Sequence, residues 1–124
     1  MTQKNTAMIG AIFGFLSVAI GAFAAHGLKL EGYAQSVFET GVRYQFYHAL
    51  ALMVIGFGKQ TWFDNKVGLF WTVGIFIFSG SLYGIVLLDE KRLGMITPLG
   101  GICFLVGWMM LILRIYKSKD KLVS

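Results

Sequence analysis

The chain has 124 residues, of which 56% are apolar and 14% are charged, and its formal net charge is +5. This composition excludes a multidomain protein and is too apolar for a soluble domain of this size, so one transmembrane domain over residues 1–124 is expected. The positive charge does not indicate nucleic-acid binding, because no basic stripe is interleaved with exposed aromatic residues.

Four long apolar stretches cover residues 7–25, 41–58, 67–88 and 95–116, and each contains about 18–22 residues. A bilayer core of ~30 Å needs about 20 helical residues per crossing. The stretches are continuous and far longer than the alternating strands of a membrane barrel, so they predict helices. The expected fold is all-α, an integral membrane four-helix bundle.

The first stretch has some features of a secretory signal peptide. Lys4 precedes it, and Ala22-Phe23-Ala24 has the small-residue spacing of a cleavage site. The apolar run is nevertheless longer than the roughly 7–15 residues of a signal-peptide core. We therefore expect it to be retained as the first membrane helix.

The connector between the first two stretches carries a helical pattern. Apolar residues from Leu30 to Val42 recur at i, i+3, i+4 and i+7, and polar residues occupy the opposite face. This pattern predicts a short amphipathic helix in the membrane interface, and the alternative is an extension of the second helix. Further along, Asp64 or Asn65 is expected to cap the third helix, and Pro98 to open the fourth.

The basic residues predict the orientation. With four crossings, one side holds seven of them, namely Lys4, Lys59, Lys66, Arg114, Lys117, Lys119 and Lys121. The other side holds four, namely Lys29, Arg43, Lys91 and Arg92. By the positive-inside rule, both termini are expected in the cytoplasm.

Polar residues inside or beside the stretches gather on the outer side of this topology. This candidate cluster comprises His26, Glu39, Arg43, Gln45, His48, Ser79, Ser81, Tyr83 and Thr97. Helical spacing predicts that Glu39 can pair with Arg43. The cluster is interpreted either as an outward-opening polar pocket or as an interhelical hydrogen-bond network, and its closeness to the interface favours the network.

No metal or cofactor is expected. His26, His48 and Glu39 are too few for a zinc site in one chain, and no haem-attachment motif is present. Cys103 lies within the fourth stretch and is interpreted as a small apolar residue.

Small residues form a second pattern, expected at helix contacts. They are Gly10, Gly14, Ser17, Gly21 and Ala25 on the first helix, Gly80 and Gly84 on the third, and Gly100 and Gly101 on the fourth. Small faces let helices approach closely in lipid. Most are expected to pack inside the chain, and a homo-oligomer through the first helix is the alternative.

Four sequence blocks carry a family resemblance. They run from Gly21 to Leu28, from Thr40 to Ala51, from Phe78 to Tyr83 and from Ile96 to Gly101. In this order they resemble the signature of domain of unknown function 423, a small bacterial membrane family whose eukaryotic relatives are called transmembrane protein 256. The resemblance implies four membrane helices in the bacterial inner membrane. Ala24 replaces a glycine frequent in the family pattern.

The sequence therefore favours a non-enzymatic structural or binding protein of the bacterial inner membrane, with membrane lipid as its partner and no catalytic residue. A small transporter or channel is one alternative, although drug exporters of this size use a carboxylate buried in a span, and none lies in the first, third or fourth stretch. A lipid- or quinone-directed enzyme is another, with His48 as base and Ser79, Ser81 or Tyr83 as nucleophile.

Overall fold

Helices form almost all of the structure. The computed structural model describes residues 1–119, so Lys121 lies outside the described residues. Its α-helices are α1 (Gln3–Phe23), α2 (Gly32–Phe57), α3 (Asn65–Gly74), α4 (Gly80–Leu87) and α5 (Thr97–Lys117). The π-helical turn Ala24–Leu28 prolongs α1, and the π-helical turn Ile75–Ser79 joins α3 and α4 into one rod. Residues 1–119 contain no strand, which confirms the all-α prediction.

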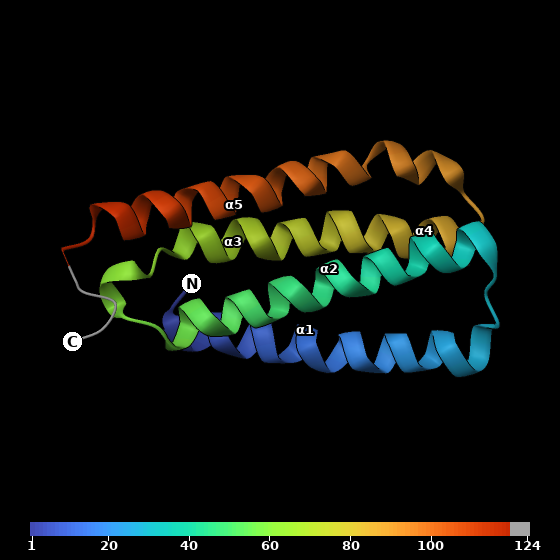
Figure 1. Cartoon of the computed structure of the whole chain (residues 1–124), viewed down its shortest axis with the longest axis horizontal. Helices are drawn as coiled ribbons and strands as arrows, with labels where there is room; N and C mark the ends of the chain where they lie inside the picture. Colours follow the sequence, from blue (N-terminus) through green and yellow to red (C-terminus); the bar gives the residue numbers. More distant parts are fainter. Residues whose placement is uncertain (120–124) are drawn as a thin grey trace.

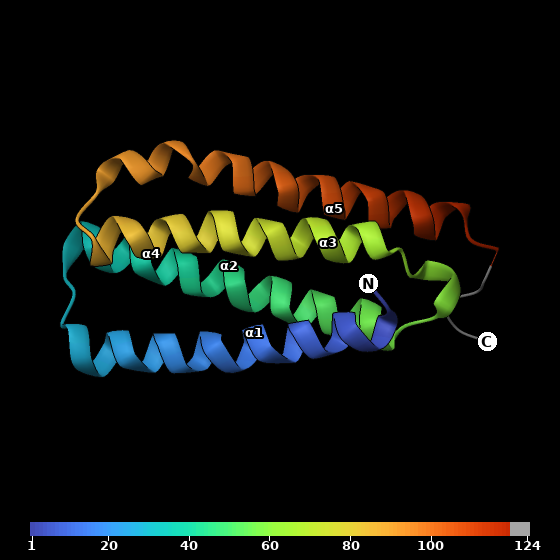
Figure 2. The ribbon, with the colours of Figure 1, turned by 180° about the vertical axis from the view of Figure 1, so that it is seen from behind.

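Four helical rods lie side by side (Figures 1 and 2). α2 lies between α1 and the rod formed by α3 and α4, and α5 packs on the other side of that rod. Short 3-10 turns, Gln60–Trp62 and Lys91–Met95, lie in two of the connections. The start of α1 and the end of α5 are at the same end of the rods.

Polar side chains fix the helix starts. Thr2 caps α1 by accepting the backbone N–H of Asn5 at 3.1 Å. Asp64 accepts the N–H of Lys66 at 2.9 Å, which confirms the cap predicted at the start of α3. Pro98 lies in the first turn of α5, where its missing N–H leaves no helical bond unmade.

The reversal between α1 and α2 is short. Lys29 has φ 50° and Gly32 has φ 58°, and these two left-handed residues turn the chain within a few positions. The amphipathic segment predicted to precede the second span is helical, but it is continuous with α2, which begins at Gly32. The prediction of a separate interfacial helix is therefore wrong, and the alternative of an extended second helix describes the chain.

Three helical segments of residues 1–119, rather than the predicted four, are long and apolar enough to cross a membrane. They are Gln3–Leu28, Asn65–Leu87 and Lys91–Lys117. The stretch 41–58 does not reach this level, because Arg43, Gln45 and His48 lower the hydropathy of its first half. Length and apolar content therefore support three crossings by themselves and do not identify α2 as a fourth.

The outward faces of the rods are apolar. Phe15 on α1 is 74% exposed and Leu105 on α5 is 69% exposed, and many other large apolar side chains share this orientation. The buried core lies between the rods and includes Leu52, Trp71 and Phe104. A surface of this kind is suited to lipid rather than to water.

The connection from α4 to α5 contains an exposed ion pair. Arg92 Nε lies 2.9 Å from Glu90 Oε1, and the backbone N–H of Arg92 donates to the same oxygen. The guanidinium, followed by this N–H, holds the pKa of Glu90 below its ordinary value. Solvent screens the pair, so its role is local and it shapes the turn.

Candidate functional site

Gln45 connects α2 to two other rods. Its side chain is only 3% exposed, and its amide nitrogen donates to the backbone carbonyl of Phe13 on α1 at 3.0 Å. Its amide oxygen accepts the hydroxyl of Tyr83 on α4 at 2.6 Å. The Ser17 hydroxyl also donates to the Phe13 carbonyl, at 2.7 Å. A buried polar line therefore crosses the molecule from α1 through α2 to α4.

The π-helical turn of the third rod makes a second connection to α2. The buried Ser79 hydroxyl at the end of this turn donates to the carbonyl of Gly41 at 2.7 Å. Gly41 also permits close approach, because an added Cβ would lie 2.8 Å from the Tyr83 ring. π-helical turns are rare and are frequent at functional sites. Here the turn places the Ser79 hydroxyl against the backbone of α2.

His48 connects α2 to α5. Its Nδ1 lies 2.8 Å from the carbonyl of Tyr44, and Trp108 donates its indole N–H to Nε2 at 3.0 Å. A carbonyl can only accept and an indole N–H can only donate, so these partners require a neutral ring protonated at Nδ1. The ring of Phe104 stacks on His48, with centroids 3.6 Å apart and planes at 9°.

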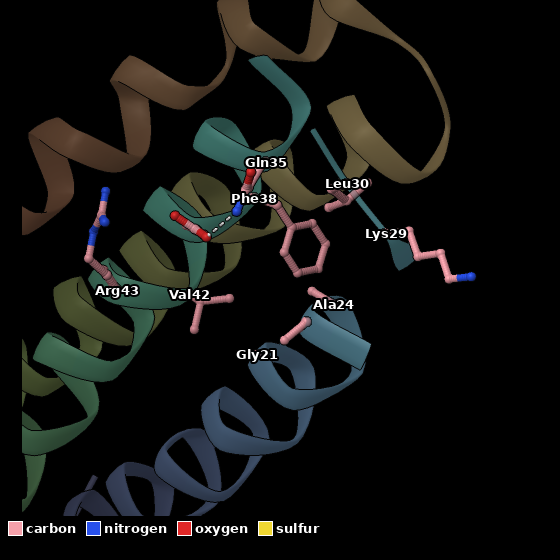
Figure 3. A pocket seen from close by; sticks show the side chains of 10 residues that line it. Gly21, Ala24, Lys29, Leu30, Gln35, Phe38, Val42 and Arg43 are labelled. Atoms are coloured by element: carbon pink, nitrogen blue, oxygen red, sulfur yellow. Dashed lines mark hydrogen bonds between the residues drawn. The ribbon is translucent and has the colours of Figure 1, made fainter. Parts of the chain in front are cut away.

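A cleft lies where the end of α1 faces the start of α2, and we call it the rim cleft (Figure 3). Its volume is about 380 Å³. The ring of Phe38 points from α2 toward Gly21 of α1 and Ala24 of the following π-helical turn, and it forms the apolar floor. Lys29 and Arg43 extend from opposite sides of the cleft. Glu39, the carboxylate of this cleft, accepts the amide of Gln35 at 3.1 Å.

Comparison with known proteins identifies the family. A family model described as "Protein of unknown function (DUF423)" matches residues 20–101. The chain belongs to this family. A UPF0382 membrane protein of Staphylococcus aureus, SAB0533, is 45% identical over 119 residues, which cover 93% of this chain and 98% of that protein. No solved structure matches the chain.

Relatives occur in other bacteria as well. A UPF0382 membrane protein of Haemophilus influenzae is 42% identical over 97% of this chain and 99% of its own length. YwdK of Bacillus subtilis, also a UPF0382 membrane protein, is 40% identical over 93% of this chain and 98% of its own length. This DUF423 chain is therefore similar to membrane proteins along nearly its whole length.

The structure brings together only part of the polar cluster predicted for this DUF423 chain. Gln45, His48, Ser79 and Tyr83 are buried or half-buried and join α2 to the other rods. Ser81 and Thr97 form a separate pair between α4 and α5, at 2.5 Å between their hydroxyl oxygens.

Three predicted members lie apart from the buried network. His26 is exposed on the π-helical turn that ends α1. Arg43 is also exposed and donates to the Thr40 hydroxyl at 3.3 Å, so the predicted pairing with Glu39 is wrong. Glu39 instead accepts a hydrogen bond from the amide of Gln35, which lies four positions earlier on the same helix. Both residues belong to the rim cleft rather than to the network.

The small residues predicted at helix contacts divide in a similar way. At Gly10, an added Cβ would lie 2.7 Å from the Ala49 carbonyl oxygen, so the backbones of α1 and α2 meet there. Gly21 faces Val42 more loosely, and Ser17 is buried. At Gly14 an added Cβ would meet nothing within 4 Å, because Gly14 lines an open cavity beside the junction of α1 and α2. Gly14 therefore does not pack inside the chain.

Ala25 is exposed, and an added Cβ at Gly80 would meet nothing within 4 Å, so the predicted packing is also wrong at these two positions. Gly84 faces Leu93, and Gly100 lies directly against the backbone of Phe78. Gly101 is only in loose contact with the Phe78 ring, at 4.0 Å.

Sequence reasoning missed the hydrogen bonds that Trp71 and Trp108 make to other helices. Trp71 is fully buried and donates its indole N–H to the carbonyl of Phe104 at 3.3 Å, and Trp108 donates to His48. Tryptophans in membrane helices usually lie near the interfaces, and a buried indole N–H needs a partner. A tryptophan inside an apolar stretch, such as Trp71, is therefore a usable signal for an internal acceptor.

The described residues also limit what the site can hold. Residues 1–119 contain no group of three or more His, Cys, Asp or Glu side chains placed to bind a metal ion. Gln45 and His48 of α2 form hydrogen bonds with partners within the chain, whereas the rim cleft has cations beside an apolar floor. The network is thus suited to holding helices together, and the cleft is suited to a ligand.

Proposed function

We propose that this chain is a multi-pass protein of the bacterial inner membrane with a non-enzymatic structural or binding role. In this proposal all four rods cross the bilayer as a four-helix bundle, and both termini are cytoplasmic. Membrane lipid is its partner. The similarity to bacterial UPF0382 membrane proteins supports the location.

The observation that carries the proposal is the way α2 uses its polar side chains. Gln45 bonds to α1 and α4, and His48 bonds to α5. A polar group in hydrocarbon costs little when its hydrogen bonds are made within the protein. This internal pairing removes the objection that the hydropathy of α2 raises against a fourth crossing.

The placement of α2 gives further support. Its 26 residues extend about 39 Å at the helical rise, which exceeds the ~30 Å of a bilayer core. α2 also lies beside α1 and the α3–α4 rod along their length (Figure 2). If these apolar neighbours cross the bilayer, a rod packed between them occupies the same depth.

A non-enzymatic role is supported by the partners of the candidate catalytic groups. A serine nucleophile needs a base within hydrogen-bond reach. His48 is engaged by Tyr44 and Trp108, whereas Ser79 is engaged by the Gly41 carbonyl. Ser81 is engaged by Thr97 and Phe78. The described hydrogen bonds therefore pair His48 with neither serine.

The topology can be tested with reporter fusions in the inner membrane. A reporter that is active only in the cytoplasm should be active at the N-terminus, after Trp62 and at the C-terminus. At Glu90 only a reporter that is active outside the cytoplasm should give a signal. Four crossings place the two termini on the same side, whereas three place them on opposite sides. Termini on opposite sides of the membrane would refute the proposed crossing of α2.

A further inference from the structure

Three cavities lie in succession along the junction of α1 and α2. The rim cleft shares Gly21, Val42 and Arg43 with a second cavity of about 250 Å³. This second cavity shares Val18 and Phe46 with a third, of about 540 Å³, that continues toward Gly10. The shared residues place the three cavities end to end along the junction of α1 and α2, and we call this row of cavities the α1–α2 groove.

The groove is polar at one end only. Its rim carries Lys29, Gln35, Glu39 and Arg43, whereas its far part is lined by Gly10, Ala11, Gly14, Phe15, Leu50 and Met53. From Ala25 to Gly10 the helical rise gives a length of about 22 Å. One bilayer leaflet contributes about half of the ~30 Å hydrocarbon core, so the groove is long enough for an acyl chain of one leaflet.

The charges at the rim favour an anionic group. Lys29 and Arg43 are exposed, and neither forms an ion pair with a carboxylate within residues 1–119. The carboxylate of Glu39 is occupied by the Gln35 amide. Among the residues that line the cleft, two cations against one carboxylate give a net positive charge, which attracts anionic lipid headgroups.

We propose that the α1–α2 groove binds one anionic phospholipid of the surrounding bilayer. The phosphate lies at the rim, where Lys29 and Arg43 supply the positive charge, and one acyl chain follows the groove past Val18 and Phe46 to Gly14. The missing side chain of Gly14 leaves the space that this chain fills. This site rests on the proposed binding role and gives that role its ligand class.

Lipid retention measured by native mass spectrometry tests the proposal. The full chain, purified in detergent, is mixed with phosphatidylglycerol or with phosphatidylcholine carrying the same acyl chains. We expect phosphatidylglycerol to be retained preferentially. Lys29→Gln and Arg43→Gln should each lower its affinity about fivefold and leave phosphatidylcholine unaffected. Lys91→Gln removes a cation at the same end of the rods, outside the groove, and should have no effect.

Gly14→Leu tests the acyl part of the groove. The new side chain enters open space, so the variant should fold normally while losing retention of both lipids. Gly80→Leu is the matched control, because an added Cβ there also meets nothing within 4 Å and Gly80 lies outside the groove.

Two results would overturn the lipid site. The first is equal retention of the two lipids by the unaltered chain. The second is a homodimer that Gly14→Leu converts to folded monomer, which would show that a second copy occupies the groove. Reporter fusions measure crossings and not lipid binding, so failure of the proposed topology is distinguished from failure of the site.

Discussion

The two outer rods, α1 and α5, each pack on the rest of the molecule through a junction that contains glycines. The junctions differ in whether side chains fill the space beside those glycines. Between α5 and the α3–α4 rod, aromatic rings occupy the space left by glycines: Phe104 lies over Gly74, and Trp71 lies against Gly107. Between α1 and α2, backbones meet at Gly10 but leave open space at Gly14. Glycine spacing alone thus does not distinguish a packed junction from a groove.

The largest loss is expected from Gly100→Leu in the packed junction. A side chain at Gly100 would fall on the backbone of Phe78, which cannot move away as a flexible side chain would. Overpacking of this kind costs about 3 kcal/mol or more when backbone must shift. The variant should lose its folded peak in fluorescence-detected size exclusion. Gly101→Leu is the neighbouring control and should remain folded, because Gly101 has only one loose contact.

Gly10→Leu should produce the next largest effect, at the closed end of the α1–α2 junction. Its Cβ would lie 2.7 Å from the Ala49 carbonyl oxygen and 3.0 Å from Leu52 Cβ. We expect a loss of about 1–3 kcal/mol in unfolding free energy, measured by denaturant titration in mixed micelles. Equal stabilities for Gly10→Leu and Gly14→Leu would contradict the description of a junction that is closed at one end and open beyond.

Gln45→Leu tests the polar line that joins the two halves. It removes two interhelical bonds and leaves the Tyr83 hydroxyl without its acceptor. At ~0.6–1.7 kcal/mol per interhelical bond in a membrane protein, the total loss should be about 1–3 kcal/mol. Thermal unfolding followed by circular dichroism gives the measurement. Gln35→Leu alters an exposed glutamine of the same helix and serves as the control.

His48→Phe should have the smallest effect of the four. The new ring can still stack on Phe104, so only the bonds to Tyr44 and Trp108 are lost. We expect a loss of about 0.6–1.7 kcal/mol for the interhelical bond. The indole N–H resonance of Trp108 should also shift on loss of its acceptor. An unchanged resonance would show that this bond is not formed in the membrane.

The sequence predicted helices well and helix contacts poorly. Continuous apolar stretches and the signals at Asp64 and Pro98 depend on neighbouring positions, so they can be read locally. The contrast between Gly10 and Gly14 depends on how the two helices are rotated against each other, which is set by packing. His48 and Trp108 are 60 positions apart, and their bond requires the register of two helices.

Composition alone does not show which polar residues of α2 are buried. The polar residues of the candidate cluster are costly in lipid, but Arg43 and Gln45 are only two positions apart and have opposite surroundings. Gln45 faces the other rods and is buried, whereas Arg43 faces outward at the rim. Helical periodicity could separate these faces, although it could not identify Phe13 or Tyr83 as the partners.

The position of α2 in the chain has a consequence for biogenesis. α2 is synthesised second, and of the interhelical hydrogen-bond partners of Gln45 and His48 only the Phe13 carbonyl precedes it on the ribosome. Tyr83 and Trp108 are translated 38 and 60 positions after their partners Gln45 and His48. A helix whose polar groups are still unpaired partitions weakly into lipid. If α2 crosses the bilayer as proposed, the order of synthesis favours its entry as a hairpin with α1, with its remaining hydrogen bonds made only when the later helices leave the translocon.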